Sequence, residues 1–184
     1  TQSWFRWRPG GASGGAASDP RAKWKVEHKD GRGFVTGKAG EQDTSTARRD
    51  TAKDPKRIVI VGRGAAGFAA AEMLRRGGFD GVLTMFSSDE DAPYDRPNLS
   101  KDYLAGTAEE AWMPLRGDDF YADNRIDLRL RTTVSGIDAK AGSVTSDDGR
   151  PVSFDRLLLA TGAEPVRLKI PGTEPPHVFT LRSM

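Results

Sequence analysis

The stretch RIVIVGRGAAGFAAAEMLRRGG, residues 57–78, decides the fold of this chain. It opens with an apolar run, residues 58–61, that has the length and the β-branched composition of a buried strand. A glycine turn follows, and then an alanine-rich segment, residues 69–74, that is typical of a helix and ends at Gly77–Gly78. A second apolar run, residues 82–86, is about the length of a strand. We therefore predict a β-α-β unit, whose crossover helix requires the two strands to be parallel.

The turn between the first strand and the helix matches the pattern G-x-G-x-x-G at Gly62, Gly64 and Gly67. In this pattern the first glycine permits the tight turn, the second lets a diphosphate approach the backbone, and the third lets the helix pack close to the strand. The helix N-terminus offers unpaired N–H groups and a partial positive charge to the same anion. The pattern alone is weak, but its place between a strand and a helix favours a dinucleotide site over a glycine turn without a ligand.

The rest of the chain adds β-structure to this unit. Apolar residues alternate over residues 126–134, and Asp148–Gly149 marks a hairpin. The segment RLLLATGAEP contains another buried strand, residues 157–160. The predicted fold class is α/β: a Rossmann-type parallel sheet with a small β-meander inserted before its last strand.

Residues 1–56 have a different character and are expected to form an arm and a linker. The Gly, Ala, Ser and Pro content of residues 9–20 predicts a flexible segment. Alternating Trp24 and Val26, followed by Asp30–Gly31, predict a β-hairpin over residues 22–37. An isolated hairpin is marginal in water, so it should belong to something larger. We thus divide the chain into an arm with a hairpin, residues 1–56, and an incomplete Rossmann-type domain, residues 57–184.

Composition excludes several classes of site. The chain has no cysteine, which rules out disulfides, catalytic thiols and cysteine-ligated clusters within these 184 residues. The two histidines lie far apart, and we expect no metal site. No apolar run is long enough to cross a membrane, and the basic arm lacks the interleaved aromatic residues of a nucleic-acid platform. We therefore expect no membrane and no nucleic-acid partner. We also expect a cytoplasmic location, which the lack of cysteine does not decide.

The stretch PYDRPNLSKDYLAG, residues 93–106, places an arginine between two prolines and a lysine five residues later. A cation held so stiffly suggests a phosphate or a flavin. Together with residues 57–76 and RLLLATGAEP, this stretch resembles the FAD-binding half of ferredoxin-reductase-type flavoproteins. These form the apoptosis-inducing-factor-like and oxygenase-reductase branch of the pyridine nucleotide–disulfide oxidoreductases. The resemblance covers about residues 57–182 and is nearest to a sub-branch with an N-terminal Rieske module. Residues 19–38 resemble the last hairpin of that module.

The resemblance implies an extended FAD and a set of residues around it. Arg96 would hold phosphate oxygens of the adenosine diphosphate part, although it could instead pair with a nearby carboxylate. Lys101 would lie beside the isoalloxazine as the one residue with a catalytic role, although it could instead be a surface residue in the first turn of a short helix capped by Ser100. The other implied cofactor contacts are Gly62, Gly64, Ala65, Ala66 and Gly67 at the diphosphate, Val134 at the adenine, and Ala160, Thr161 and Gly162 at a packing turn.

The adenosine ribose is the point at which this sequence departs from the family. The family places a carboxylate at the end of the second strand, where this chain has Ser88. Asp89 or Glu90 must substitute for it, and the sequence does not decide between them.

By resemblance, the chain is the FAD-binding portion of an NAD(P)H-dependent oxidoreductase that passes electrons to a ferredoxin-, rubredoxin- or Rieske-type iron–sulfur protein. The NAD(P)H site expected from the family does not occur in these 184 residues, so we expect the chain to be inactive alone. Two alternatives stay open: a truncated, non-catalytic nucleotide-binding remnant, and a nicotinamide-only Rossmann domain.

Overall fold

The computed structural model describes residues 4–5, 12–14, 24–38, 54–172 and 178–184. The chain separates into two compact units, Thr1–Thr44 and Ser45–Met184. The expected linker, residues 39–56, lies largely outside the described residues.

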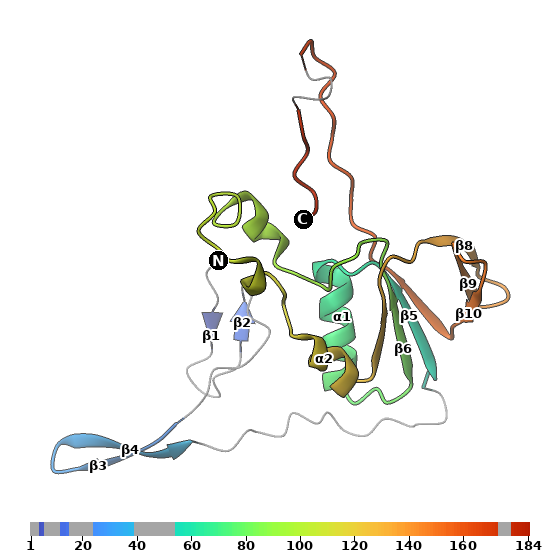
Figure 1. Ribbon diagram of the computed structural model, residues 1–184. Coiled ribbons are helices and arrows are strands. Elements are labelled where there is room, and N and C mark those ends of the chain that lie inside the picture. The colour runs from blue at the N-terminus through green and yellow to red at the C-terminus, as the bar shows by residue number, and fades with distance from the viewer. Residues whose placement is uncertain (1–3, 6–11, 15–23, 39–53, 173–177) are drawn as a thin grey trace. The chain divides into compact units, whose positions relative to one another are not determined.

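A parallel sheet forms the centre of the second unit (Figure 1). Its strands stand in the order β11-β5-β6-β7. Their bounds are Arg57–Val61 for β5, Val82–Phe86 for β6, Ile126–Arg129 for β7 and Arg156–Leu159 for β11. All three pairings are parallel, so the prediction of a Rossmann-type parallel sheet is confirmed.

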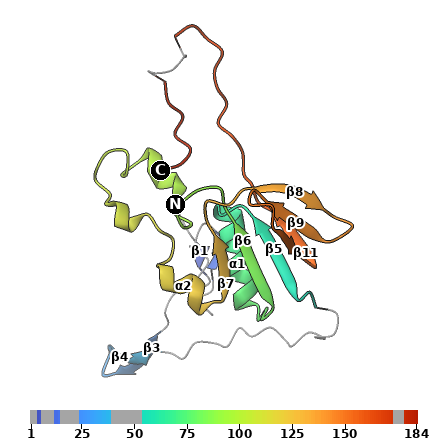
Figure 2. The ribbon, with the colours of Figure 1, turned by 45° about the vertical axis from the view of Figure 1, so that its right-hand side comes forward.

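Helices cover one face of this sheet. Helix α1, Ala65–Arg76, is the crossover between β5 and β6, and the short helix α2, Asp118–Asp123, precedes β7 (Figures 1 and 2). Alternate residues of the central strands point towards the helices, because side chains alternate between the two faces of a strand. The resulting core contains Ile58, Ile60, Phe68, Ala71, Leu83, Met85, Tyr121 and Ile126.

The predicted β-meander covers the other face. Strands β8 (Val134–Asp138), β9 (Ser143–Ser146) and β10 (Pro151–Ser153) form an antiparallel sheet in the order β10-β9-β8. Val144 of β9 is fully buried and packs with Val59 and Phe86 of the parallel sheet. The parallel sheet therefore lies between a helical layer and a small antiparallel layer (Figure 2).

The segment between β6 and α2 is irregular but has its own small core. Tyr94, Leu99 and Met113 are buried together, and an isolated bridge joins Tyr94 to Pro114. Two short 3-10 helices, η1 (Arg96–Ser100) and η2 (Glu110–Trp112), lie in this segment. Helix η1 ends at Ser100 and Lys101 is its C-cap, so the expected short helix after a Ser100 cap is wrong, whereas Lys101 is exposed as that alternative expected. The proline at the start of η1 accounts for this difference, because proline favours the first turn of a helix.

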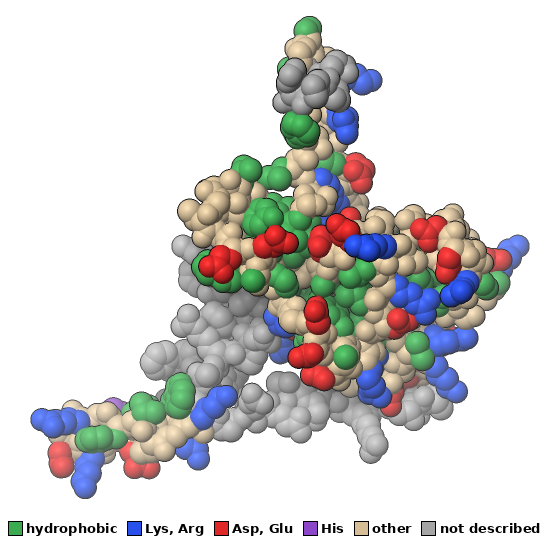
Figure 3. All heavy atoms as spheres, viewed as in Figure 1, with side chains coloured by type: hydrophobic (Ala, Val, Ile, Leu, Met, Phe, Trp, Pro, Cys, Tyr) green, Lys and Arg blue, Asp and Glu red, His purple; other side chains and the backbone are tan. Residues whose placement is uncertain are grey.

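In the first unit, β3 (Trp24–Lys29) and β4 (Arg32–Lys38) form the predicted hairpin. Asp30 and Gly31 both have positive φ, 53° and 72°, as a two-residue type I′ turn requires. Trp24 and Val35 are more than half exposed, and hydrophobic and basic side chains lie along this hairpin in Figure 3. Two-residue β1 (Trp4–Phe5) also pairs antiparallel with β2 (Ala12–Gly14), and β2 lies inside residues 9–20, for which we expect flexibility. Backbone pairing over so few residues needs no hydrophobic core, and so leaves no apolar pattern in the sequence.

The described residues lack two kinds of feature. None of the helices in these ranges is long and apolar enough to span a membrane. Within the same ranges, no group of three or more His, Cys, Asp or Glu side chains is arranged to hold a metal ion.

Candidate nucleotide-binding site

A cavity of about 260 Å³ opens at the carboxyl ends of β5, β6 and β11. Strand β5 pairs with β6 on one side and with β11 on the other, so the chain changes direction across the sheet at this point. Ligands of open α/β sheets bind in the crevice outside such a switch point. The cavity is lined by Val61, Gly62, Arg63, Gly64, Phe86, Ser87, Ser88, Asp89, Arg96, Thr132, Thr133, Val134, Ala160, Thr161, Gly162, Glu164, Arg182 and Ser183.

The three positions of the turn require glycine for different structural reasons. A Cβ on Gly62 would lie 2.1 Å from the carbonyl oxygen of Ala160, and Gly62 has a φ of 110°. A Cβ on Gly67 would lie within 1.9 Å of the carbonyl oxygen of Gly62. A Cβ on Gly64 would meet nothing within 4 Å, and φ there is an ordinary −65°. Packing within the protein thus explains why residues 62 and 67 are glycines. Gly64 lines the cavity, and its missing side chain leaves that part of the cavity open.

The N-terminus of α1 lies beside this open space. Gly64 is the N-cap, and the first intrahelical bond runs from the N–H of Phe68 to the carbonyl oxygen of Gly64, at 2.9 Å. The N-cap makes no side-chain hydrogen bond, and the first turn contains no acidic residue. The N–H groups of that turn and the partial positive charge of the helix end are therefore available to an anion.

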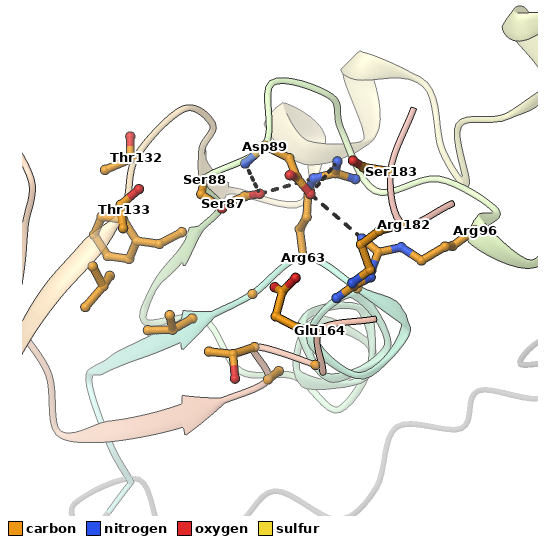
Figure 4. A pocket seen from close by; sticks show the side chains of 18 residues that line it. Arg63, Ser87, Ser88, Asp89, Arg96, Thr132, Thr133, Glu164, Arg182 and Ser183 are labelled. Carbon is orange, nitrogen blue, oxygen red and sulfur yellow. Dashed lines mark hydrogen bonds and ion pairs between the residues drawn. The ribbon is translucent and has the colours of Figure 1, made fainter. Parts of the chain in front are cut away.

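Arg63 is a buried cation in the wall of the cavity (Figure 4). The residue is 3% exposed. Its Nε donates to Ser87 Oγ at 3.1 Å, and its Nη1 donates to the carbonyl oxygen of Ala92 at 3.0 Å. Its Nη2 lies 2.9 Å from Asp89 Oδ2, and the guanidinium carbon lies 4.6 Å from the centre of the Tyr94 ring. Since a buried charge is costly unless it is paired, these contacts account for its stability in this position.

The charged lining is cationic on balance. It consists of three arginines, Arg63, Arg96 and Arg182, and two carboxylates, Asp89 and Glu164. Nη2 of Arg96 lies 3.8 Å from Asp89 Oδ2, too far for a hydrogen bond, and the Arg96 side chain is about one third exposed. A net positive, partly exposed lining suits an anionic ligand such as a diphosphate.

The residues expected at the site separate into two groups. Eight of them line the cavity: Gly62, Gly64, Asp89, Arg96, Val134, Ala160, Thr161 and Gly162. Ala65 and Ala66 are exposed in the first turn of α1, and Gly67 is buried in the contact between that turn and β5. Lys101 is exposed and lies outside the lining. Glu90 also lies outside it, and its carboxylate pairs instead with exposed Arg131 at 2.7 Å.

Sequence reasoning missed Arg63, Arg182, Glu164 and the Thr132–Thr133 pair. Arg63 occupies a variable position of the glycine pattern, which carries no expectation of a functional side chain. Its burial, which requires acceptors close by, results from packing and leaves no signal in the sequence. Arg182 lies twenty residues after Gly162 in the sequence. The fold brings Nη2 of Arg182 to within 3.0 Å of the position that a Cβ on Gly162 would occupy.

Comparison with known proteins places this geometry in a family. The profile of the pyridine nucleotide-disulphide oxidoreductases matches residues 56–184. Rubredoxin-NAD(+) reductase of Ectopseudomonas oleovorans is 42% identical over 127 residues, which are 69% of this chain and 33% of that protein. The ferredoxin reductase component of chlorobenzene dioxygenase from Cupriavidus sp. (strain PS12) is 36% identical over 126 residues, 68% of this chain and 30% of that protein.

Solved structures agree with these relatives. The ferredoxin reductase for the CYP199A2 system from Rhodopseudomonas palustris superposes with a TM-score of 0.64 at 30% identity, over 68% of this chain and 32% of that chain. The reductase in a covalent putidaredoxin reductase–putidaredoxin complex gives 0.60 at 39% identity, over 62% and 27%.

The chain spans about a third of the length of the curated relatives it matches. Nothing in the comparisons bears on the Rieske-fused sub-branch, which stays a prediction. Because the family profile matches well over half of the residues, this chain belongs to the pyridine nucleotide-disulphide oxidoreductase family.

Proposed function

We propose that residues 57–184 bind the adenosine diphosphate part of FAD, as the FAD-binding portion of an NAD(P)H-dependent reductase for an iron–sulfur protein. Two kinds of support meet here: relatives named as ferredoxin and rubredoxin reductases, and a cationic cavity at the switch point of the sheet. A cytoplasmic location is part of the same proposal.

Gly64 is the observation that carries the proposal. Its missing side chain is not required by any neighbouring atom, yet it keeps open the space in front of a helix N-terminus. A bound diphosphate explains the glycine, because only a residue without a side chain lets the phosphate oxygens reach the backbone. The cavity volume of about 260 Å³ suits part of an extended dinucleotide rather than all of it.

The other groups around the cavity would contact different parts of the ligand. The first-turn N–H groups of α1 would donate to the diphosphate, and Arg96 would add a planar, charged donor pair on the side of the loop. Val134 and Phe86 contribute apolar surface at the far wall, which suits an adenine ring. When bound, FAD would supply the hydride and single-electron chemistry, for which protein groups provide position and electrostatics.

Asp89 is better placed than Glu90 to accept hydrogen bonds from the adenosine ribose. Asp89 lines the cavity, three residues beyond the end of β6. Glu90 is exposed and pairs with Arg131 outside the cavity. Lys101 is exposed at the end of η1, where it could meet a flavin that extends beyond the cavity.

The alternatives predict other ligands. A nicotinamide-only domain would hold NAD in the same cavity and retain no flavin, and a non-catalytic remnant would retain neither. All three hypotheses are consistent with the cavity lining and the glycine turn. The named relatives favour the flavoprotein.

The test is a visible absorption spectrum of the 184-residue chain after incubation with excess FAD and desalting. We expect a retained flavin band in the unchanged chain. We expect Gly64→Asp to weaken FAD binding by about tenfold or more, or about 1.4 kcal/mol, because it places a carboxylate and its side chain where the diphosphate should lie.

Gly117→Asp is the matched control. Gly117 is the N-cap of α2 with φ −66°, and a Cβ there also meets nothing within 4 Å, but it does not line the cavity. Aspartate is a favourable N-cap, so neither variant should lose stability. Equal flavin retention in both variants would refute the proposed site, and no retained flavin in the unchanged chain would favour the two alternatives.

A further inference from the structure

Arg63 connects the glycine turn to the loop that follows β6. Its guanidinium contacts Ser87 and Asp89 (Figure 4) and the carbonyl oxygen of Ala92, which are three points along that loop. Ser87 Oγ also accepts a hydrogen bond from the backbone N–H of Asp89 at 3.1 Å. Asp89 is therefore held both through its carboxylate and through its backbone, and both connections lead back to Arg63.

Both arginines approach the Asp89 carboxylate most closely at the same oxygen. Arg63 Nη2 and Arg96 Nη2 approach the same atom, Oδ2, at 2.9 and 3.8 Å. Among the described residues, no hydrogen bond reaches Oδ1, and the closest approach of each arginine is to Oδ2. An ionised carboxylate has about four acceptor positions, so Oδ1 is open to a donor from a ligand in the cavity.

One N–H donor group of Arg63, Nη2, makes no hydrogen bond among the described residues. Its ion pair with Asp89 is close, but the Nη2 N–H is not aligned on Oδ2, and this buried nitrogen has no hydrogen-bond partner among the described residues. A buried donor without an acceptor is costly, and a small rotation of the Asp89 carboxylate would satisfy it.

We propose that Arg63 is a positioning residue of the nucleotide site: it holds Asp89 so that Oδ1 accepts a hydrogen bond from the ribose 2′-hydroxyl of the adenosine part. Arg63 keeps the Asp89 carboxylate paired. Arg96 can therefore move from this carboxylate to a phosphate of the ligand without leaving Asp89 unpaired. This inference rests on the proposed nucleotide site and adds to it a residue that sets the preference for ribose over 2′-deoxyribose.

The test is titration calorimetry of the full 184-residue chain with ADP and with 2′-deoxy-ADP. ADP contains the diphosphate and the ribose but no flavin, and the two ligands differ only in the 2′-hydroxyl. We expect the unchanged chain to prefer ADP by about tenfold, the order expected for one hydrogen bond to a charged acceptor. In Arg63→Met we expect the preference to fall to about twofold or less, and Asp89→Asn should lower it in the same way.

Arg131→Met is the matched control. Arg131 pairs with Glu90, the neighbour of Asp89 in sequence, but lies outside the cavity. The ratio of ADP to 2′-deoxy-ADP affinity should stay at its original value in this variant. A merely structural role for Arg63 would weaken both ligands equally and would not change the ratio.

Ser87→Ala gives an independent route if Arg63→Met fails to fold. It removes the hydroxyl that links Arg63 Nε to the Asp89 N–H but keeps the arginine, and the ratio should fall. A ratio near one in the unchanged chain, or an unchanged ratio in both Arg63→Met and Ser87→Ala, would overturn this inference and leave the nucleotide site intact. Absence of any ADP or FAD binding would overturn the proposed function and this inference together.

Discussion

The contact between Gly67 and the carbonyl oxygen of Gly62 sets how closely α1 approaches β5. A Cβ at residue 67 would fall 1.9 Å from that oxygen and 3.3 Å from the side chain of Ile60. Both neighbours are fixed, one by the backbone of the turn and one by the core. Methyl groups are therefore excluded here by the fold, whether or not a ligand is bound.

We expect Gly67→Ala to lower the free energy of unfolding by about 3 kcal/mol, the upper range for overpacking a rigid site. The gain in helix propensity from alanine, about 1 kcal/mol, is smaller than this cost. Urea denaturation measures the difference.

Gly64→Ala serves as its control, since the added methyl group meets no atom. It should cost less than about 1 kcal/mol, as expected for a weaker N-cap. If the two variants were equally stable, the close contact at Gly67 would not be a constraint of the fold.

The start of β11 is fastened to the start of β5 by one side chain. Asp155 Oδ2 accepts hydrogen bonds from the backbone N–H groups of Lys56 and Arg57, both at 2.8 Å, and Oδ1 pairs with the Arg57 guanidinium at 2.9 Å. The Arg57 side chain and the two backbone donors lower the pKa of the Asp155 carboxyl to about 2. The carboxylate thus stabilises the parallel pairing of two strands that are about a hundred residues apart in sequence.

This contact predicts a stability that depends on pH. The folded-state pKa lies below the ordinary unfolded value, so the stabilising contribution is complete above about pH 4 and is lost as the pH falls towards 2. Asp155→Asn should therefore be less stable than the unchanged chain at neutral pH, and the difference should shrink over that window.

Thermal unfolding at several pH values measures the effect. The exposed carboxylate of Asp123, at the end of α2, provides the control substitution Asp123→Asn. A difference for Asp155→Asn that stays constant from neutral pH to about pH 2 would contradict the proposed role of its charge.

At the scale of the whole chain, stability should reside in the second unit. Every buried hydrophobic cluster of the described residues consists of side chains from residues 58–160. The side chains of the β3–β4 hairpin are almost all exposed, so little apolar burial stabilises it. We expect removal of residues 1–44 to leave the midpoint and the steepness of urea unfolding of the second unit unchanged.

Circular dichroism of the chain with and without these residues measures this expectation. Steepness reports the surface exposed on unfolding, so it distinguishes a lost contact from a merely shorter chain. A lower midpoint after the truncation would show that the first unit contributes to the stability of the second.

Local sequence determined the elements because the chemistry of each is local. The apolar runs at 58–61 and 82–86, the Gly77 stop of α1 and the Asp30–Gly31 turn each act within a few residues, and the structure confirms all of them. The parallel sheet followed from the same information, since a crossover helix leaves no other pairing direction. Family motifs also predicted seven of the cavity-lining residues, and Asp89 was one of two alternatives for an eighth.

Only the tertiary structure decided how the charges pair. In sequence, Asp89 and Glu90 are neighbouring carboxylates and Arg63 is a variable position of a glycine pattern. The fold brings Arg63 and Asp89 together at the ends of adjacent strands and sends Glu90 outward to Arg131. Electrostatic contacts depend on distance in space rather than on spacing along the chain, so no local pattern could distinguish the carboxylate in the cavity from the one outside it.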